Sequence, residues 1–476
     1  MMKDMAETFF FYDLETSGLD PRRDRIMQFA GQRTTMDLDP IGEPFNILVR
    51  LNDDVLPSPD AVMVTGITPQ KTHEEGIAEA EFIKLFHNQV CTPGTVTVGF
   101  NNIRFDDEFI RFALWRNFHD PYEWAWKDGR SRWDLLDVVR MTRALRPGGI
   151  VWPVDKSDKP TNRLELLTSE NNLEHSQAHD ALSDVYALIA ITRMVRDKQP
   201  KLFEYLFSIR DKKAVTQLVN PYKPKPIVYT SGRYDANYHK TSVVFPIAEG
   251  SRPGTTFVYD LRHNPQQFTD LSPEEIKKRL LAKWEERKDP NFVAIPVKEV
   301  THNRAPAVAP LGVLEQGGGW ENIQLTNETV RKHLEVLQRS PDLVTKIKTA
   351  YESRSFPKSS DAEAQLYDSF LNDKDKTHIQ AVRNASEREL ADFHPEFNDK
   401  RLPPLLIRYK ARNFPRSLSE EEQVEWEAYR ATRLQAELPG YMGAIARIAK
   451  TDPSENTQFL LQELQLWAES IVPVDL

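Results

Sequence analysis

The first 200 residues alternate short apolar runs with segments in which apolar side chains recur every three or four positions. Short continuous apolar runs are typical of buried strands, and the three-to-four spacing is typical of helices. The predicted strands are residues 8–12, 26–34, 45–51 and 95–100. The predicted helices are residues 78–90, 132–145 and 180–197. Strands that alternate with helices indicate an α/β domain, a mixed sheet with flanking helices, over residues 1–200.

The pattern changes after residue 200. Prolines at positions 221, 224 and 226 interrupt regular structure. One helical segment follows at residues 273–287 among several short runs of strand character. These runs are residues 227–230, 242–246, 256–260 and 292–297. Short strands in this arrangement predict a small β-barrel or sandwich over residues 201–355.

From about residue 356 the apolar spacing is helical again. Helices are predicted at residues 360–372, 376–385, 418–438 and 454–471. Ser419 precedes three glutamates, which is typical of a helix start, because acidic side chains in the first turn interact favourably with the helix dipole. The third part, residues 356–476, is therefore predicted to be a helical domain.

Composition narrows the class of protein. Of the 476 residues, 28% are charged and 40% are hydrophobic, which fits a folded globular chain rather than a disordered one. The single cysteine, Cys91, excludes an intramolecular disulfide and a cysteine-based zinc cluster. The apolar run at residues 9–12 is too short for a signal peptide, and no run of about 18 apolar residues occurs. We therefore expect a cytoplasmic protein without a membrane span.

Charge is unevenly distributed along the chain. The formal net charge is −9, which by itself disfavours a nucleic-acid partner, although a partner responds to local patches. Residues 400–416 contain six basic residues and no acidic one, and residues 201–240 contain eight basic and three acidic residues. Basic segments with interleaved tyrosine and phenylalanine are typical of single-strand nucleic-acid grooves. These two segments are therefore candidate binding surfaces.

Two carboxylates stand at the end of the first predicted strand, in the sequence Asp13-Leu14-Glu15-Thr16. Residues i and i+2 of a strand point to the same face, so Asp13 and Glu15 can converge. Converging carboxylates repel one another unless a cation lies between them, and Mg²⁺ or Mn²⁺ prefers such oxygen ligands. An isolated Asp-x-Glu pair is, however, more often a solvated surface pair.

Two further segments place polar side chains at helix starts. Asn102 and Asp106 follow the predicted strand at residues 95–100, where Asn102 suits a turn and Asp106 suits the first turn of a helix. His179 lies just before the predicted helix at residues 180–197, and Asp184 lies about one turn into it. A histidine beside a metal site can take a proton from water. Each segment by itself also fits an ordinary capped helix.

In chain order the three segments read Asp-x-Glu, Asn-x-x-Phe-Asp and His-x-x-x-x-Asp. This ordered set resembles the DEDD superfamily of 3′→5′ exonucleases, in its histidine-containing branch, over residues 8–195. Further segments resemble the bacterial exodeoxyribonuclease I family: residues 101–108, 131–137, 144–147, 203–207 and 409–415. The resemblance implies a ribonuclease H-like exonuclease domain, a Src-homology-3-like barrel and a C-terminal helical domain. The expected boundaries are residues 1–200, 201–355 and 356–476.

The resemblance also implies roles for individual residues. Two Mg²⁺ ions, for which Mn²⁺ can substitute, are expected on the four carboxylates of Asp13, Glu15, Asp106 and Asp184. His179 is expected to deprotonate the attacking water. Substrate-binding positions are implied at Thr16, Thr65, Gly66, Ile67, Asn102 and Phe105. Ser17 stands where some members of the family carry an aromatic residue.

The implied activity is processive hydrolysis of single-stranded DNA from its 3′ end to 5′-mononucleotides, by a monomer, in DNA repair and recombination. The implied partner is the acidic C-terminal tail of single-strand DNA-binding protein, which Arg146 and Tyr205 would contact. For Arg146 a helix C-cap role is equally consistent. Two alternatives stay open: an exoribonuclease of the same superfamily, and a non-catalytic nucleic-acid-binding protein on a decayed exonuclease fold. All four carboxylates and His179 are present, which argues against the second.

Overall fold

The computed structural model describes residues 7–173, 180–354 and 358–473. The chain divides into two compact units. The first contains residues 1–130, 176–186 and 358–476, and the second contains residues 131–175 and 187–357. The first unit therefore unites most of the predicted exonuclease domain with the predicted helical domain.

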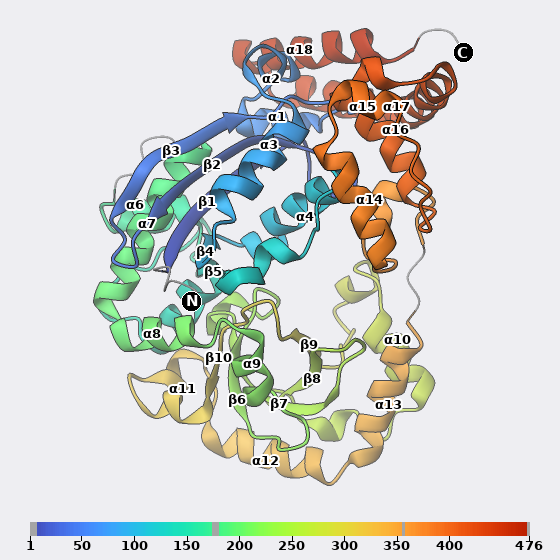
Figure 1. Cartoon of the computed structure of the whole chain (residues 1–476). Coiled ribbons are helices and arrows are strands. Elements are labelled where there is room, and N and C mark those ends of the chain that lie inside the picture. Colours follow the sequence, from blue (N-terminus) through green and yellow to red (C-terminus); the bar gives the residue numbers. More distant parts are fainter. Residues whose placement is uncertain (1–6, 174–179, 355–357, 474–476) are drawn as a thin grey trace, which may run out of the picture. The chain divides into compact units, whose positions relative to one another are not determined.

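The first unit is built on a mixed sheet with β1 (Thr8–Thr16) at its centre. In this unit β1 pairs antiparallel with β2 (Ile26–Thr34), and β2 pairs antiparallel with β3 (Pro40–Leu48). On its other side β1 pairs in parallel with β4 (Thr95–Gly99). Residues 9–12 of β1 are at most 2% exposed, which explains why this strand reads as a continuous apolar run. Figure 1 shows these strands side by side in blue.

Short helices cover this sheet within the first unit. They are α1 (Pro59–Thr65), α2 (Pro69–Glu75), α3 (Glu79–Leu85), the π-helical turn η1 (Phe86–Val90), the 3₁₀ turn η2 (Asn102–Arg104) and α4 (Asp106–Arg116). The core under α3 and α4 joins Phe10 and Phe29 of the sheet to Phe82, Phe86 and Ile110. Because these side chains are fully buried, β1 and the start of α4 are held in a fixed relation to each other.

The C-terminal helices of the first unit are α14 (Asp373–Asn384), α15 (Glu387–Ala391), α16 (Leu402–Asn413), α17 (Glu420–Thr451) and α18 (Glu455–Ile471). Ser419 begins α17 with a capping box, as its sequence predicts. One core joins Leu434 and Leu464 to Val62 of α1, and another joins Leu402 to Phe112 of α4. The C-terminal helices and the exonuclease segment therefore share two hydrophobic cores.

The second unit holds an antiparallel five-stranded sheet in the order β10-β6-β7-β8-β9 (Figure 1). Its strands are β6 (Ile227–Thr230), β7 (Thr241–Glu249), β8 (Thr255–Asp260), β9 (Val297–Thr301) and β10 (Val308–Pro310). The helices of this part are α10 (Pro273–Leu281), α11 (Gly319–Asn322), α12 (Asn327–Gln338) and α13 (Pro341–Glu352).

The second unit begins with β5 (Ser131–Asp134) and α5 (Leu135–Leu145), and it also contains α6 (Leu164–Glu170), α8 (Pro200–Ser208) and α9 (Lys212–Leu218). Helix α7 (Ala181–Lys198) starts in the first unit and continues into the second.

The structure corrects several of the predicted elements. The predicted helix at 132–145 starts as β5, and Asp134 then caps α5 by accepting a hydrogen bond from the Leu136 amide at 3.1 Å. The predicted strand at 292–297 begins only at Val297, because Pro296 has no N–H for a ladder. The predicted helix at 360–372 contains only the 3₁₀ turn η9 (Ala362–Gln365).

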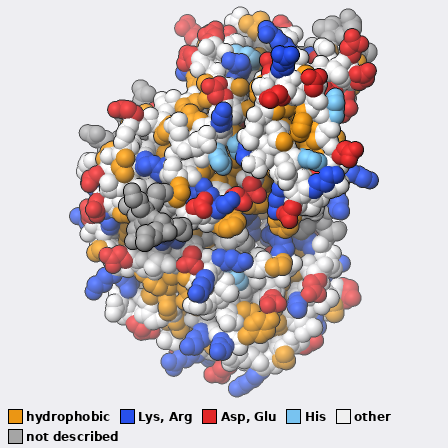
Figure 2. All heavy atoms as spheres, viewed as in Figure 1, with side chains coloured by type: hydrophobic (Ala, Val, Ile, Leu, Met, Phe, Trp, Pro, Cys, Tyr) orange, Lys and Arg blue, Asp and Glu red, His pale blue; other side chains and the backbone are white. Residues whose placement is uncertain are grey.

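Acidic and basic side chains are intermixed on the face of the molecule in Figure 2. In the part of the chain that the structure describes, no helix has both the length and the apolar character needed to cross a membrane.

Candidate active site

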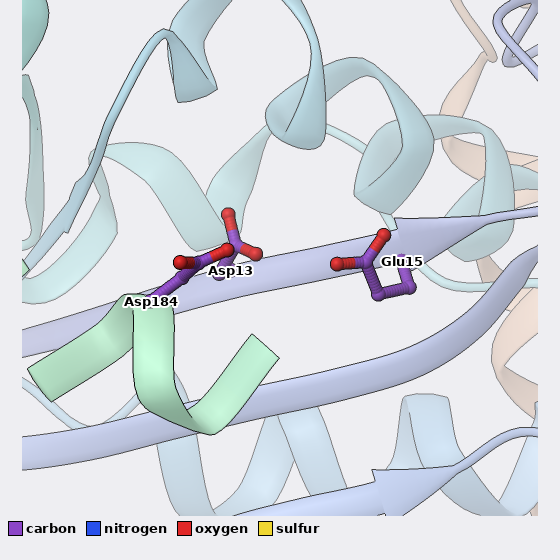
Figure 3. A group of neighbouring side chains, drawn as sticks. All are labelled: Asp13, Glu15 and Asp184. Carbon is purple, nitrogen blue, oxygen red and sulfur yellow. The ribbon is translucent and has the colours of Figure 1, made fainter. Parts of the chain in front are cut away.

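Three carboxylates converge in the first unit. Asp13 and Glu15 project from β1, and Asp184 approaches from the start of α7 (Figure 3). Each of the three offers an oxygen that lies within 4.8 Å of the others. Asp13 and Glu15 alternate with Leu14, which is 5% exposed and faces the core, so the strand period places both acids on the other face. The spacing of this group suits a metal ion with oxygen ligands.

The start of α7 is organised by Asp180. Its carboxylate accepts a hydrogen bond from the Ser183 amide at 3.1 Å, and its carbonyl accepts one from the Asp184 amide at 3.0 Å. This is the pattern of an N-cap residue, which fixes the direction of the first helical turn. Asp184 is thereby held toward β1. His179, the predicted general base, lies outside the described residues.

Asp106 is the first residue of α4 and is 4% exposed. It is not one of the three acids whose oxygens lie within 4.8 Å of one another. Its negative charge nevertheless acts on the group, because it raises the pKa of both Asp13 and Glu15. The structure therefore brings the fourth predicted carboxylate to the edge of the cluster.

The pKa values record how unfavourable this arrangement is for bare carboxylates. Burial, together with the charges of Asp184, Asp106 and Asp180, raises the pKa of Glu15 to about 8. The pKa of Asp13 is raised well above its ordinary value by burial and by the charges of Asp106, Glu15 and Asp184. Buried carboxylates this close together are stable only when protonated or when a cation lies between them. A divalent cation would offset both the cost of burying their charges and the repulsion between them.

Two residues that sequence reasoning passed over hold α4 against β1. The Tyr12 hydroxyl donates a hydrogen bond to the Asp107 carboxylate, and the Asn102 amide donates to the same oxygen at 3.3 Å. All three side chains are at most 1% exposed. The signal that identifies Asp107 is its position next to Asp106 at the start of α4. Side chains of consecutive helical residues point in directions about 100° apart, so only one of these two acids can face the site. Asp107 thus faces the interior and leaves Asp106 toward the cluster.

The predicted substrate-binding residues have the following places. Thr16 is buried and its hydroxyl donates to the Gly18 carbonyl at 2.7 Å. Gly66 ends α1 in the left-handed conformation at φ 66°, a geometry that favours glycine. The Thr65 hydroxyl accepts from the Ile67 amide at 3.2 Å, and Ile67 belongs to the core shared with α18. Phe105 is half-buried against Phe109, with ring centroids 5.0 Å apart.

Ser17, the departure from the family pattern, is fully buried. Its hydroxyl accepts from the Arg25 amide at 2.9 Å and contacts the Asp24 carboxylate at 3.3 Å. Its role in this chain is to close the turn between β1 and β2.

The two predicted partner-binding residues lie in the second unit. The Arg146 guanidinium donates to the carbonyls of Val313 at 3.2 Å and of Gln316 at 3.0 Å, and so has structural partners. The Tyr205 hydroxyl donates to the Val308 carbonyl at 3.3 Å, and burial raises the pKa of Tyr205 to about 12.

The basic segment at residues 400–416 is not an exposed stripe. Four of its six cations are buried in ion pairs: Arg401 with Asp399, Arg408 with Asp361, Lys410 with Glu422, and Arg412 with Asp54. Only Lys400 and Arg416 are exposed. The interpretation of this segment as a nucleic-acid groove is wrong for those four residues, because each is paired with a carboxylate that lies outside the segment.

Comparison with known families defines the class of protein. An exonuclease family model matches residues 10–192, the exonuclease I SH3-like domain matches residues 210–353, and the exonuclease I C-terminal domain matches residues 360–471. The chain is therefore a nuclease that combines an exonuclease domain, an SH3-like domain and a C-terminal domain. This confirms the predicted fold class and supports the prediction of a nuclease over a non-catalytic binding protein on a decayed exonuclease fold.

Individual relatives give the particular family. Exodeoxyribonuclease I of Haemophilus influenzae is 37% identical over 466 residues, which cover 97% of this chain and 98% of that protein. The crystal structure of Escherichia coli Exonuclease I with a dA16 oligonucleotide is 37% identical, with a TM-score of 0.94, and covers 98% of this chain and 100% of that one. Exonuclease I from Methylocaldum szegediense is 42% identical over the same shares, with a TM-score of 0.92. A zinc-bound form of the E. coli protein with single-stranded DNA is also similar. This chain belongs to the exodeoxyribonuclease I family.

Proposed function

We propose that this protein is a magnesium-dependent 3′→5′ exonuclease that degrades single-stranded DNA to 5′-mononucleotides. The observation that carries the proposal is the convergence of the oxygens of Asp13, Glu15 and Asp184 within 4.8 Å, on a chain of the exodeoxyribonuclease I family. The raised pKa values of Asp13 and Glu15 support it, because these acids are poised to exchange protons for a cation. Mn²⁺ would substitute for Mg²⁺, since both take oxygen ligands.

Different residues would hold the metal ions, act as general base and position the metal ligands. Asp13, Glu15 and Asp184 would hold two metal ions together with Asp106. When bound, such ions supply an activated water and charge stabilisation at the leaving 3′ oxygen. His179 would take the proton of the attacking water as general base. Tyr12, Asn102 and Asp107 keep the start of α4, and with it Asp106, at a fixed place beside β1.

Further parts of the proposal concern the substrate and the partner. Thr16, Thr65, Gly66, Ile67, Asn102 and Phe105 are proposed to line the site of the terminal nucleotides. Asn102 and Ile67 are buried, so they would act by shaping that site rather than by direct contact. We also propose processive action by a monomer in DNA repair and recombination.

The acidic tail of single-strand DNA-binding protein is the proposed partner of Arg146 and Tyr205. Arg146→Ala tests this, with tail-peptide affinity and nuclease rate measured in parallel. Loss of tail binding at an unchanged nuclease rate supports the assignment. Unchanged tail binding refutes it and leaves Arg146 as the anchor of residues 313–316.

The experiment that tests the proposed function is digestion of end-labelled single-stranded DNA, double-stranded DNA and single-stranded RNA, each with Mg²⁺ and with a chelator. The expected result is release of 5′-mononucleotides from the 3′ end of single-stranded DNA only, and only with Mg²⁺. Faster digestion of RNA would instead support the exoribonuclease alternative. Asp184→Asn serves as the matched inactive control, because it keeps the size of the side chain and removes its charge.

A further inference from the structure

A cavity of about 790 Å³ lies in the first unit, at the opposite end of α4 from Asp106. Its walls come from α3 and η1, from the turn that follows α4, from the ends of α14 and α16, and from α15. Because α4 has 11 residues and a helix rises about 1.5 Å per residue, this end of α4 lies roughly 15 Å from Asp106. The cavity is therefore separate from the candidate active site, and its volume is in the range of small-molecule sites, about 300–1,000 Å³.

His119 lines this cavity with a neutral imidazole. The residue is 5% exposed, and burial, together with the charges of Arg383 and His87, lowers its pKa to about 3. Its Nδ1 is buried without a hydrogen-bond partner among the described residues, so Nε2 is the nitrogen that the cavity can reach. Buried donors without a partner are rarer in proteins than buried acceptors, which places the ring proton on Nε2. The imidazole thus offers a hydrogen-bond donor to the cavity.

Tyr409 offers a second donor to the same cavity. Its ring belongs to a hydrophobic core, where its centroid lies 5.3 Å from that of Phe118. Burial raises the pKa of the hydroxyl to about 12, so it keeps its proton, and the opposing effect of the Arg383 charge shows that Arg383 is close. In the part of the chain that the structure describes, the hydroxyl has no hydrogen-bond partner and remains accessible. It can therefore donate to a ligand.

Arg383 supplies the charge of the inner cavity. Its guanidinium is half-buried in the last turn of α14, and burial lowers its pKa. Among residues 7–173, 180–354 and 358–473, this guanidinium has neither an ion pair nor a hydrogen bond. The charge of Glu123 acts on it, but Glu123 is paired with Lys127 at 2.7 Å. A half-buried guanidinium with free donors favours an oxyanion as its partner.

The balance of charge favours an anion with a single charge. The rim of the cavity carries the exposed residues Lys84, Glu81 and Glu389, and the inner part carries Arg383. Glu389 is engaged, because its Oε2 accepts from the Ser386 amide at 2.8 Å and from the Ser386 hydroxyl at 2.7 Å. A phosphate monoester would bring two negative charges beside these glutamates, whereas one guanidinium balances a carboxylate. The two oxygens of a carboxylate can also accept from all three donors.

Apolar side chains leave room for the rest of such a ligand. Phe414 is half-buried, with its ring centroid 5.6 Å from that of Tyr409, and Ala78, Ala80 and Ala385 also line the cavity. An apolar body placed there would be removed from water while its carboxylate reaches the donors.

We propose that this cavity binds a small organic monocarboxylic acid, with its carboxylate on Arg383, Tyr409 and His119 and its apolar body against Phe414. The proposal is independent of the proposed function, since none of these residues belongs to the metal site. The walls come from the exonuclease segment and from the C-terminal helices of the first unit, so an occupied cavity is expected to stabilise this unit against unfolding.

The test is isothermal titration calorimetry of the full-length protein with phenylacetate, in chelator so that no metal ion offers the carboxylate another site. The wild type is expected to bind phenylacetate, and to bind phenylacetamide, which has the same shape without the charge, at least 10-fold more weakly. Arg383→Gln is expected to weaken phenylacetate binding roughly 10- to 100-fold and Tyr409→Phe roughly 2- to 10-fold, because Arg383 supplies a charge and Tyr409 a single hydrogen bond. The matched control is Arg388→Gln, which removes an exposed last-turn arginine of α15 that does not line the cavity, and its affinity is expected to be unchanged.

Thermal unfolding measured in parallel guards against misfolding. Phenylacetate is expected to raise the unfolding temperature of the wild type and of Arg388→Gln, and to leave that of Arg383→Gln unchanged. Absence of phenylacetate binding by the wild type overturns the proposal. Equal affinity of the wild type and Arg383→Gln also overturns it, because the ligand would then bind elsewhere on the chain. Tighter binding of phenyl phosphate than of phenylacetate would overturn the choice of a monocarboxylate.

Discussion

Glu363→Gln should lower the free energy of unfolding of the first unit by about 3–5 kcal/mol, the usual cost of removing one partner from a buried ion pair. Glu363 and Asp54 are both 0% exposed and lie among arginines from two parts of the chain. The Glu363 carboxylate contacts Arg25 at 2.9 Å and Arg412 at 2.6 Å. Asp54 contacts Arg412 at 2.8 Å and Arg433 at 2.9 Å.

The magnitude follows from burial. The Arg25 side chain is 2% exposed and the Arg412 side chain 4% exposed, so neither guanidinium can turn to water when its partner loses its charge. Burial and the charges of neighbouring arginines lower the pKa of Arg25 to about 10, so this cation depends on its carboxylate partners. A neutral amide still accepts one hydrogen bond but no longer balances the charge.

The assay is urea unfolding at neutral pH, followed by circular dichroism and tryptophan fluorescence. The matched control is Asp60→Asn, which removes an acid from an ion pair with Arg447 whose side chains are 61% and 55% exposed. That control should cost no more than about 1 kcal/mol, because exposed pairs contribute little.

The pH dependence gives a second check. The arginines hold the pKa of Glu363 well below its ordinary value, so its contribution is complete above the unfolded value of about 4.3. That contribution is lost as the pH falls through the folded-state pKa, and the difference between the wild type and Glu363→Gln should therefore shrink in acid. A loss below about 1 kcal/mol at neutral pH, equal to that of the exposed control, would refute the reasoning.

The remaining predictions concern the site itself. Glu15, with its pKa raised to about 8, should release a proton when Mn²⁺ binds, so metal affinity should rise with pH up to about 8. Calorimetry in buffers of different ionisation enthalpy measures the number of protons released, and Glu15→Gln should release fewer protons than the wild type. His179→Ala should cut turnover roughly 10²–10⁴-fold and leave DNA affinity intact, as measured by single-turnover rates and anisotropy; near-normal turnover would remove it from the mechanism. Tyr12→Phe should destabilise the protein by about 1.5–3 kcal/mol, because Asp107 loses a buried donor, and thermal melting that matches the wild type would contradict this role.

Much of the site could be predicted from the sequence because its signals are local. The two-residue period of β1 places Asp13 and Glu15 on one face, and Asp184 falls at the start of a helix with clear periodicity. Each of these residues is near a regular element whose geometry is known in advance. The distance between Asp184 and the two acids of β1 depends on how α7 packs beside β1, and the hydrophobic periodicity of the sequence does not determine that packing.

The errors at residues 360–372 and 400–416 have a common physical cause, which is that partners outside the segment decide its structure. Residues 360–372 have helical spacing, but Asp361 caps only a short 3₁₀ turn, and Glu363 in that turn is held by Arg25 and Arg412. Residues 400–416 form a run of basic residues because the paired acids lie outside it: Asp399 and Glu422 are just beyond its two ends, and Asp54 is distant in the sequence. The pairing of Glu363 with Arg25 and of Arg412 with Asp54 joins residues that are far apart in the sequence. A count of charges over a short segment therefore misleads where the ion pairs are buried.

The most direct test of the central claim is the number of Mn²⁺ ions bound per chain, measured by electron paramagnetic resonance in the presence of a non-cleavable single-stranded oligonucleotide. If the carboxylates of Asp13, Glu15 and Asp184 form the metal site, the wild type should bind two ions and Asp184→Asn should bind fewer. Equal binding by the wild type and by Asp184→Asn would contradict the account.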